Sequence, residues 1–502
     1  MRVFIYTAAM IMAEGLFPQG LVDSLALKYA GLISRAELER DLAFLASDAM
    51  EGRDTGERGQ KMAAAYIRQH FVNAGIPPVP TQQGIEDGYY QPFELEVQQL
   101  GNIGIRTNER ELRFMSDILY FDQSIQQGET PLNELIHLGD GSTLNAVTNL
   151  DNKNIWLVKD NMPVTELMAW VRRHSGVLKA SGAATVIIST NQFLPLKEAI
   201  GHYLQGKRMT LAEMNAEKGP DTQVIVVDDT AMTHILGSPR KLVSAKKKKP
   251  GKRHPTNAVL VRVPGKGKVH TENVLAYIEG EEKKDELVIV TAHYDHVGVE
   301  NGEVYNGADD NGSGTVAVMA IAKAFAKAKA DGNGPRRSVL IMPVSAEEKG
   351  LLGSRYYTEN PVFPLENTVA NLNIDMIGRI DSAHLNSGPY VYVIGSDRLS
   401  SELHEINEAA NSHVGLALDY TFNAEDDPNR FYYRSDHYNF ARKGIPAMFY
   451  FSGVHADYHQ PGDMVDKIRY DLLHKRALLV FHTAWELANR PERIVVDKPL
   501  GE

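Results

Sequence analysis

The feature that most constrains the fold is a regular alternation of strand-like and helix-like segments after residue 258. The helix-like segment 313–330 is rich in alanine, lysine and methionine, which favour helices. Strands that alternate with helices form largely parallel or mixed sheets with helices on their faces. We therefore predict an α/β fold with a mixed, mostly parallel central sheet. Its apolar strand-like segments are 273–280 (NVLAYIEG), 287–293 (LVIVTAH), 338–348 (SVLIMPVSAEE), 369–378 (VANLNIDMIG), 390–395 (YVYVIG) and 445–453 (IPAMFYFSG).

Acidic and histidine residues follow these strands at the points where the strands end. His293 ends one strand, and Asp375 ends another. In open α/β sheets, functional residues gather just beyond the C-terminal ends of the strands. We therefore expect these side chains to converge at one edge of the sheet. The other polar residues in such positions are Asp309 and Asp310 in NGADDNGSG (306–314), Glu347, Glu348, and the segment HADYHQPGD (455–463).

Carboxylates that converge with no lysine or arginine among them need a cation. Because histidines belong to the set, zinc suits it better than calcium or magnesium. Two zinc ions can share a bridging carboxylate, so five protein ligands would hold two zinc ions per chain. Glu347 would then stay off the metal, free to take a proton from water. The predicted ligands are His293, Asp310, Glu348, Asp375 and His459.

Each of these residues also has an ordinary structural interpretation. A lone histidine at a strand end is commonly hydrogen-bonded within the fold, and paired glutamates are commonly solvated. Both ADD between glycines and YHQPGD are compatible with simple turns. The prediction of a metal site depends on their conjunction, because all five residues occur in order and each follows a strand.

The polar residues lie in six motifs: TAHYDHVG, YNGADDNGSG, SAEEKGLLGS, NLNIDMIGR, YYRSDHYNFARKGIP and ADYHQPGD. Together these motifs resemble the co-catalytic zinc aminopeptidase family of peptidase clan MH. This family includes bacterial leucyl aminopeptidases and aminopeptidase Y, with glutamate carboxypeptidase II, glutaminyl cyclases and the transferrin receptor as more distant relatives. The resemblance covers residues from about 270 to 490, and LAFLASDAMEGRDTGERGQKMAAAYI is similar to the helix–loop–helix that opens many members.

The resemblance implies a role for each residue of the site. Asp310 would bridge two zinc ions, and Glu347 would act as the general base. Asp295 would orient His293 and raise its basicity. The remaining ligands would divide into one pair for each zinc ion: His293 with Asp375, and Glu348 with His459.

The resemblance also implies a cis peptide bond between Asp310 and Asn311, since many family members have one after the bridging aspartate. Tyr458 and His437 are candidates for stabilising the tetrahedral oxyanion of a peptide-hydrolysis reaction. Each residue also has an ordinary structural interpretation, Tyr458 as a packed tyrosine and His437 as a structural histidine. The activity implied is that of an aminopeptidase that acts on peptides.

Composition restricts the chemistry, the partners and the location that the protein can have. The 502 residues carry a formal net charge of −11 and contain no cysteine, so disulfides and thiolate chemistry are excluded. An acidic balance argues against nucleic acid as a partner and is typical of a soluble enzyme. The apolar run Val3–Ala13 is too short to span a bilayer, so we expect no stable membrane insertion; it is either a leader remnant or a buried segment.

The rest of the chain divides into regions that differ in composition and in predicted secondary structure. Ser34 and Glu37 form the pattern of a helix-capping box, and a second helix is predicted over about 60–71. The run AKKKKPGKRHP (245–255) is interpreted as a solvated loop. The predicted divisions are 1–30 (N-terminal segment or leader), 31–100 (first part of the catalytic domain), 101–258 (an inserted, smaller protease-associated-like domain, α/β or β-rich), 259–495 (zinc peptidase domain) and 496–502 (tail).

Alternative functions stay open at this point. The same fold could carry a carboxypeptidase or a glutaminyl cyclase, although cyclases of this type use a single zinc ion. A non-catalytic receptor would be expected to lose metal ligands or the base. A serine hydrolase is disfavoured because the chain contains no G-x-S-x-G. By analogy with the family, a secreted or periplasmic location is expected.

Overall fold

The computed structural model divides the chain into two units. The first unit comprises Met1–Tyr90, Asn273–Val344 and Pro361–Glu502, and the second comprises Gln91–Glu272 and Ser345–Asn360. The predicted leader and the end of the predicted tail lie largely outside the described residues. The structure describes residues 23–80, 87–121, 127–142, 150–205, 208–212 and 222–498.

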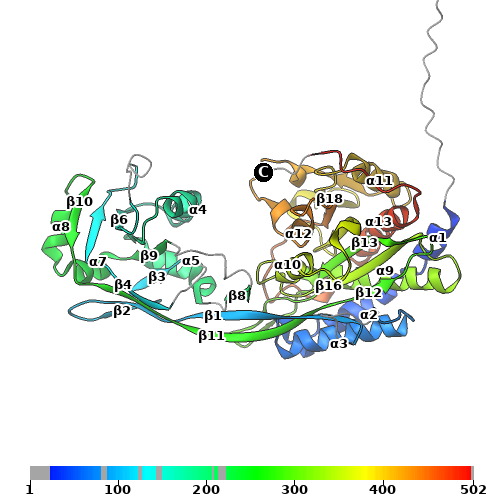
Figure 1. Cartoon of the computed structure of the whole chain (residues 1–502), viewed down its shortest axis with the longest axis horizontal. Coiled ribbons are helices and arrows are strands. Elements are labelled where there is room, and N and C mark those ends of the chain that lie inside the picture. Colours follow the sequence, from blue (N-terminus) through cyan, green and yellow to red (C-terminus); the bar gives the residue numbers. More distant parts are fainter. Residues whose placement is uncertain are drawn as a thin grey trace, which may run out of the picture. The chain divides into compact units, whose positions relative to one another are not determined.

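The first unit contains a seven-stranded mixed sheet, which confirms the predicted fold class (Figure 1). Its strands follow the order β12-β16-β13-β17-β20-β18-β19. Four neighbouring pairs are parallel, and the pairs β12–β16 and β18–β20 are antiparallel. The strands are β12 (Ala276–Ile278), β13 (Lys283–His293), β16 (Arg337–Val344), β17 (Thr368–Ile374), β18 (Tyr390–Ile394), β19 (Ala417–Asp419) and β20 (Ala447–Phe451).

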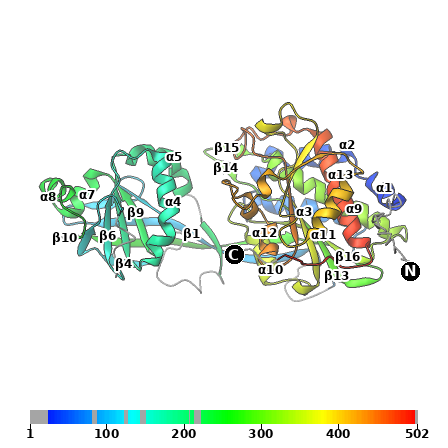
Figure 2. The same cartoon turned by 90° about the horizontal axis from the view of Figure 1, so that it is seen from above.

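Both faces of this sheet are buried, and for that reason its central strands read as continuous apolar runs. Every residue of β16 and β17 is buried. On one face, α9 (Gly314–Ala330) and α13 (Tyr470–Asn489) pack against each other and against β13 and β16 (Figure 2). The other face carries an aromatic cluster that includes Phe449 and Phe451. Along β20, neighbouring side chains alternate between the two faces.

The N-terminal helices of the first unit are α1 (Ser24–Ala30), α2 (Arg35–Leu45) and α3 (Arg58–Asn73). The Ser34 side chain accepts the Glu37 backbone N–H, as the capping pattern predicted. The Glu37 carboxylate, however, binds Lys323 on α9 at 2.8 Å. Of the two predicted capping residues, Ser34 caps the helix, whereas the Glu37 side chain links α2 to α9.

The strand ends and the loops after them position the polar residues of interest. β13 ends at His293 and β17 ends at Ile374, one residue before Asp375. A short helical segment, η3 (Ala308–Ser313), leads into α9. The prediction of strand to residue 348 is wrong at its end, because β16 stops at Val344 and a turn follows. Other short elements here are β14 (Gly298–Glu300), β15 (Glu303–Tyr305), α11 (Ser401–Asn411) and α12 (His437–Ala441).

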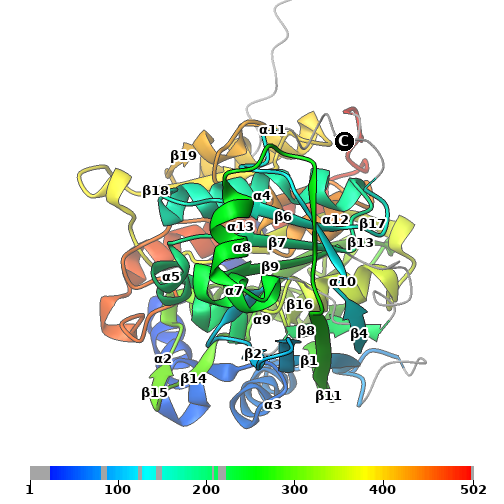
Figure 3. The ribbon, with the colours of Figure 1, turned by 90° about the vertical axis from the view of Figure 1, so that its left-hand side faces the viewer.

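The second unit contains a six-stranded sheet of order β10-β5-β6-β7-β9-β3. Its central strands β5, β6, β7 and β9 are parallel, and β6, β7 and β9 are visible beside one another in Figure 3. The strands are β3 (Ile118–Tyr120), β5 (Glu134–His137), β6 (Asn154–Val158), β7 (Thr185–Ser189), β9 (Gln223–Val227) and β10 (Lys252–Pro255).

A second, smaller sheet and several helices complete this unit. The helices are α4 (Val164–Ala180), α5 (Phe193–Gln205), α7 (Asp229–Leu236), α8 (Pro239–Lys246) and α10 (Leu352–Glu359). The smaller sheet consists of β1 (Tyr90–Arg106), β2 (Glu111–Arg113), β4 (Gly128–Pro131), β8 (Arg208–Leu211) and β11 (Val259–Val274). The unit has a hydrophobic core of its own, centred on β6, β7 and β9.

Candidate metal centre

Three buried side chains converge at the C-terminal edge of the first unit's sheet. His293 Nε2 lies 3.3 Å from Asp375 Oδ1 and 3.4 Å from Asp310 Oδ1. Each residue offers one potential ligand atom, and these atoms lie within 4.8 Å of one another. The sequence prediction that strand-end residues meet at one edge is therefore met by these three residues.

The two carboxylate oxygens of Asp310 face different imidazoles. Oδ1 faces His293, whereas Oδ2 lies 3.0 Å from His459 Nε2 and 3.8 Å from His296 Nδ1. A carboxylate oriented in this way can serve two cations, one at each oxygen. His296 was not singled out from the sequence, although its segment TAHYDHVG was.

Hydrogen bonds from distant segments hold the loop that carries Asp310. The Asp463 carboxylate accepts the backbone N–H groups of both Asp309 and Asp310. The Asn311 amide donates to the carbonyl of Ile374 and accepts the N–H of Met376, so the loop is attached to the end of β17. The predicted cis peptide bond between Asp310 and Asn311 is present.

The electrostatics of Asp310 follow from its neighbours. Burial would raise the pKa of this carboxyl, but the imidazoles of His293 and His459 hold its pKa well below the usual range. Among the described residues, no lysine or arginine forms an ion pair with Asp310 or Asp375. Negative charge is thus retained where only imidazoles oppose it, which is the donor set of a borderline divalent metal ion.

Asp375 is held by a chain of buried hydrogen bonds. Ser435 Oγ donates to Asp375 Oδ2 at 2.7 Å, and the Asn373 amide donates to Ser435 Oγ at 2.8 Å. The Thr291 hydroxyl in turn donates to the Asn373 carbonyl oxygen at 2.7 Å. This arrangement leaves Asp375 Oδ1 directed at His293. Ser435 was missed as a site residue, although it lies in the quoted motif YYRSDHYNFARKGIP.

Asp295, predicted to orient His293, contacts it mainly through its backbone. His293 Nδ1 lies 3.1 Å from the Asp295 carbonyl oxygen and 3.8 Å from its carboxylate. One carboxylate oxygen of Asp295 accepts the Thr55 hydroxyl at 2.8 Å. When Nδ1 of His293 donates its proton to that carbonyl, Nε2 carries the lone pair that a metal ion binds.

A second layer of charge lies behind the metal-facing groups. The Asp309 carboxylate accepts the Gly378 backbone N–H and lies 3.3 Å from His455 Nε2. Burial, together with the nearby Asp309, raises the pKa of Asp463 to about 6. Sequence reasoning treated Asp309 only as the neighbour of Asp310, and these contacts give it a structural role of its own.

The two glutamates predicted as ligand and base lie outside the first unit. Glu347 and Glu348 belong to the Ser345–Asn360 segment, which is part of the second unit. They follow β16 directly, in a turn where the Glu347 carbonyl accepts the N–H groups of Gly350 and Leu351. Their roles toward the metal stay predictions.

The candidates for oxyanion stabilisation differ in their surroundings. His437 is fully buried and stacks on Phe449 with 5.0 Å between ring centroids. Burial lowers the pKa of His437 to about 3, so the ring is neutral at ordinary pH. The Tyr458 ring stacks on His459 at 4.0 Å, and its hydroxyl accepts from Arg434 at 3.5 Å. Of the two, Tyr458 is the one in contact with a residue of the metal centre.

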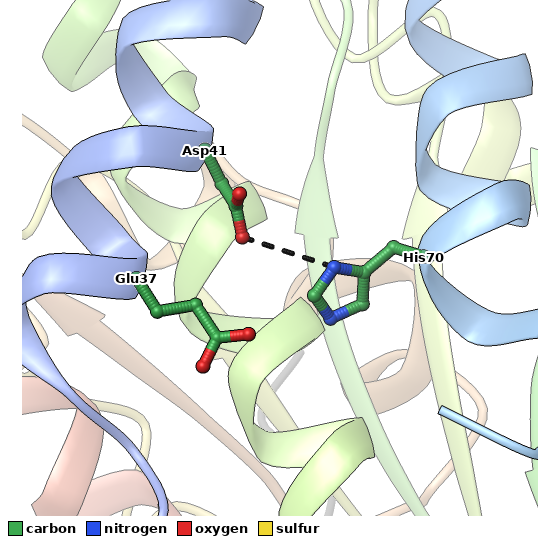
Figure 4. A group of neighbouring side chains, drawn as sticks. All are labelled: Glu37, Asp41 and His70. Carbon is green, nitrogen blue, oxygen red and sulfur yellow. Dashed lines mark ion pairs between the residues drawn. The ribbon is translucent and has the colours of Figure 1, made fainter. Parts of the chain in front are cut away.

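A different group of potential ligands, Glu37, Asp41 and His70, lies between α2 and α3 (Figure 4). The Asp41 carboxylate is 3.7 Å from His70 Nδ1 and accepts the Tyr66 hydroxyl. Cationic side chains already neutralise both carboxylates, since Lys323 binds Glu37 and Arg40 binds Asp41. This group is therefore a salt-bridged connection between helices.

Comparison with known proteins identifies the class of the fold. The structure aligns with an aminopeptidase from Aneurinibacillus sp. strain AM-1 over 94% of this chain and 98% of that chain, with a TM-score of 0.58 and 19% identity. The two proteins share a fold, which is a zinc-peptidase fold as predicted. Residues 273–484 match the model of peptidase family M28, which confirms the resemblance recognised from the motifs.

Curated relatives match over part of their length. Aminopeptidase YwaD of Bacillus subtilis (strain 168) is 27% identical over 219 residues, which cover 42% of this chain and 43% of that protein. A probable zinc metalloprotease of Pyrenophora tritici-repentis is 27% identical over 267 residues, which cover 44% of this chain and 53% of that protein. The chain thus spans about half the length of these relatives.

No helix within the described ranges is both long and apolar enough to cross a membrane.

Proposed function

We propose that the protein is a zinc-dependent exopeptidase, most specifically an aminopeptidase that removes N-terminal residues from peptides. The observation that carries this proposal is the orientation of Asp310, whose two oxygens face His293 and His459 at 3.4 and 3.0 Å. The match of residues 273–484 to a peptidase family supports it. Relatives named as aminopeptidase and zinc metalloprotease support both the metal and the substrate class.

The residues present suit two zinc ions. Asp310 Oδ2 is buried and lies 3.0 Å from His459 Nε2 and 3.8 Å from His296 Nδ1, and no lysine or arginine of the described residues pairs with it, as expected for an oxygen that faces a cation. The proposed ligands of one ion are His293 and Asp375, and those of the other are Glu348 and His459, with Asp310 shared. When bound, zinc would lower the pKa of a coordinated water and polarise the scissile carbonyl.

The other residues of the site would orient groups and move protons. Glu347 takes a proton from the attacking water and returns it to the leaving amine. Ser435 and Asp463 fix the orientations of Asp375 and of the Asp310 loop. Tyr458 donates a hydrogen bond to the tetrahedral oxyanion. Asp295 sets the tautomer of His293 through its backbone carbonyl.

Two further features of the proposal concern the whole protein. We place the second unit among protease-associated-like insertions, because the helix-to-strand segment LKASGAATVIIST resembles the one in that domain. We also propose an exported location, secreted or periplasmic, in line with the family. Peptides are the proposed substrates.

The first test measures metal content and activity together. Zinc per chain would be determined after reconstitution, and hydrolysis of an aminoacyl-nitroanilide panel would be followed for the wild type and Glu347→Gln. We expect about two zinc ions in both proteins and a rate lower by about 10²–10⁴-fold in the variant. Glu366→Gln, at an exposed position of the first unit, is the control and should retain full activity.

Each alternative function gives a different result in this experiment. A chain that binds no zinc would contradict the metal centre and favour a receptor-like protein. One zinc ion with no aminopeptidase activity would point to a cyclase. Two zinc ions without activity on the nitroanilides, together with hydrolysis of N-blocked peptides that carry a free C-terminus and are assayed alongside, would make the protein a carboxypeptidase.

A further inference from the structure

The chain carries its positive charge unevenly. Residues 230–271 contain eleven lysines and arginines and no aspartate or glutamate. Because the whole chain has a net charge of −11, the other residues together carry −22. The basic segment forms α8, the turn after it, β10 and much of β11 in the second unit.

Only part of this charge is neutralised by the fold. Lys246 binds Asp160 and Asp229 at 2.7 and 2.6 Å, and Arg253 binds Glu134 at 2.9 Å. Six exposed residues form no ion pair within the ranges that the structure describes. These residues, named the basic surface, are Arg240, Lys241, Lys247, Lys248, Lys249 and Lys252.

The local structure fixes where the basic surface points. Lys246, at the end of α8, is anchored to the body of the unit by its two aspartates. The chain then turns, and the Gly251 N–H donates to the His137 carbonyl at 2.7 Å as β10 begins. Lys247–Lys249 therefore occupy a short turn between two fixed elements, so little conformational entropy is lost when an anion binds them.

The exposed face of α8 combines cationic side chains with an aliphatic one. Leu242 and Ala245 are buried, whereas Val243 is 56% exposed. Arg240 lies three residues before Val243 and shares its face of the helix, and Lys247, the C-cap residue, follows Val243 by four residues. A cationic face around an exposed aliphatic side chain is typical of helices that rest on anionic membranes.

The same segment lacks what a nucleic-acid surface uses. Residues 230–271 contain no phenylalanine, tyrosine or tryptophan, so bases would have no aromatic side chain to stack on. Lys252 and Arg253 lie on the edge strand β10, where charged side chains hinder pairing with the strand of another molecule, and this explains their presence. It does not account for Lys247–Lys249, which precede that strand.

We propose that the basic surface docks this protein peripherally on an anionic lipid surface, with the lysines on lipid phosphates and Val243 among the headgroups. The net charge of −22 on the other residues would be repelled by such a surface and would favour binding through this face. The contact is electrostatic and reversible, and it involves no spanning segment.

The test uses the full chain and sedimentation with phosphatidylcholine vesicles, with and without phosphatidylglycerol. We expect binding only to the anionic vesicles, and weaker binding as salt is raised. Each lysine near the surface contributes about fivefold in affinity, so a triple substitution should weaken binding about a hundredfold at low salt. The triple variant is Lys247→Ala, Lys248→Ala and Lys249→Ala.

A control removes the same charge elsewhere, at exposed positions, and should bind as the wild type does: Lys153→Ala, Lys284→Ala and Lys327→Ala together. Val243→Ser separates lipid from a soluble polyanion, because it should weaken binding to vesicles but not to heparin. The proposal is overturned if the wild type ignores phosphatidylglycerol or if both triple variants bind alike. It is also overturned if heparin or DNA binds while vesicles do not.

Discussion

At the scale of single residues, the site depends on side chains that orient other side chains. Ser435 is buried and donates to Asp375 Oδ2, while Asp375 Oδ1 faces His293. A carboxylate without that donor could rotate, and its second oxygen would be left buried without a partner. Partners of metal ligands commonly matter almost as much as the ligands themselves.

Ser435→Ala should therefore weaken zinc binding by about 10- to 100-fold while the fold stays intact. Competition with a chromophoric chelator measures the affinity independently of activity. Ser338→Ala is the matched control, since that buried serine bonds to the Tyr277 hydroxyl, the Gly280 N–H and the Lys284 carbonyl, away from the site. Equal zinc affinity in Ser435→Ala and the wild type would show that Asp375 needs no such donor.

His437 gives a prediction for the dependence of stability on pH. Its folded-state pKa of about 3 lies below the ordinary value of 6.5, so the unfolded chain takes up a proton first. The neutral, buried His437 therefore contributes fully to stability above the pKa of the unfolded chain, 6.5. This contribution is lost as the pH falls toward the folded-state pKa of about 3. This residue alone should lower the free energy of unfolding by about 2 kcal/mol between about pH 7 and pH 5.

Urea unfolding of metal-free protein at both pH values tests this expectation. His437→Gln should show a loss between the two pH values that is smaller by about that amount. An unchanged loss would mean that His437 is protonated in the folded state. The comparison does not depend on any uniform destabilisation by the substitution, because that affects both pH values alike.

At the scale of elements, one buried arginine connects the loops around the site. Arg53, which is 1% exposed, donates to the carbonyls of Leu45, Tyr294, Asn306 and Gly307. It thereby attaches the end of α2 to the loop after β13 and to the loop before η3. The first of these loops carries Asp295 and the second leads directly into η3, which carries Asp310, so the geometry of the metal centre depends on this attachment.

Arg53→Met should lower the free energy of unfolding by at least about 3 kcal/mol, because each buried acceptor left without a donor costs about 1–3 kcal/mol. Chemical denaturation would measure the loss. Arg58→Met provides a comparison, since the Arg58 side chain is 71% exposed and surface substitutions usually change stability by less than about 0.5 kcal/mol. Similar losses in the two variants would contradict the role assigned to Arg53.

At the scale of the whole molecule, the two units have separate hydrophobic cores. The core of the first unit includes Phe325 and Leu473, and that of the second includes Ile187 and Leu157. The first unit supplies four of the five proposed zinc ligands. Ligand binding stabilises the folded form of the part that binds, by an amount set by ligand concentration and affinity.

Calorimetry of the zinc-free protein should accordingly show two transitions, and zinc should raise chiefly the one that belongs to the first unit. At a zinc concentration about 100 times the dissociation constant, the gain is about 2.7 kcal/mol, or about 4 °C for a unit of about 300 residues. Phe325→Ala and Ile187→Ala assign the transitions, because each removes packing from one core. A zinc shift that persists in Asp375→Asn would contradict the assigned centre.

Local patterns in the sequence predicted the mixed sheet, the positions of His293 and Asp375 at strand ends, and the place of Asp310 in the segment that leads into α9. Apolar runs and their polar ends follow from neighbouring residues, and parallel strands bring those ends to one edge. Helix α9 and the cap at Ser34 were predictable for the same local reason. The resemblance to the family added the cis peptide bond at Asp310, which no spacing of residues would indicate.

The side chains that support the metal-facing ones are brought to the site by tertiary packing. Ser435 is 60 residues from Asp375, Asp463 is 153 residues from Asp310, and Arg53 is 254 residues from Gly307. None of these residues follows a pattern in its own segment, because its partner is chosen by packing between elements far apart in the chain. The use of Glu37 to bind Lys323 has the same origin, because a contact between distant elements replaces the capping bond that the local sequence favours.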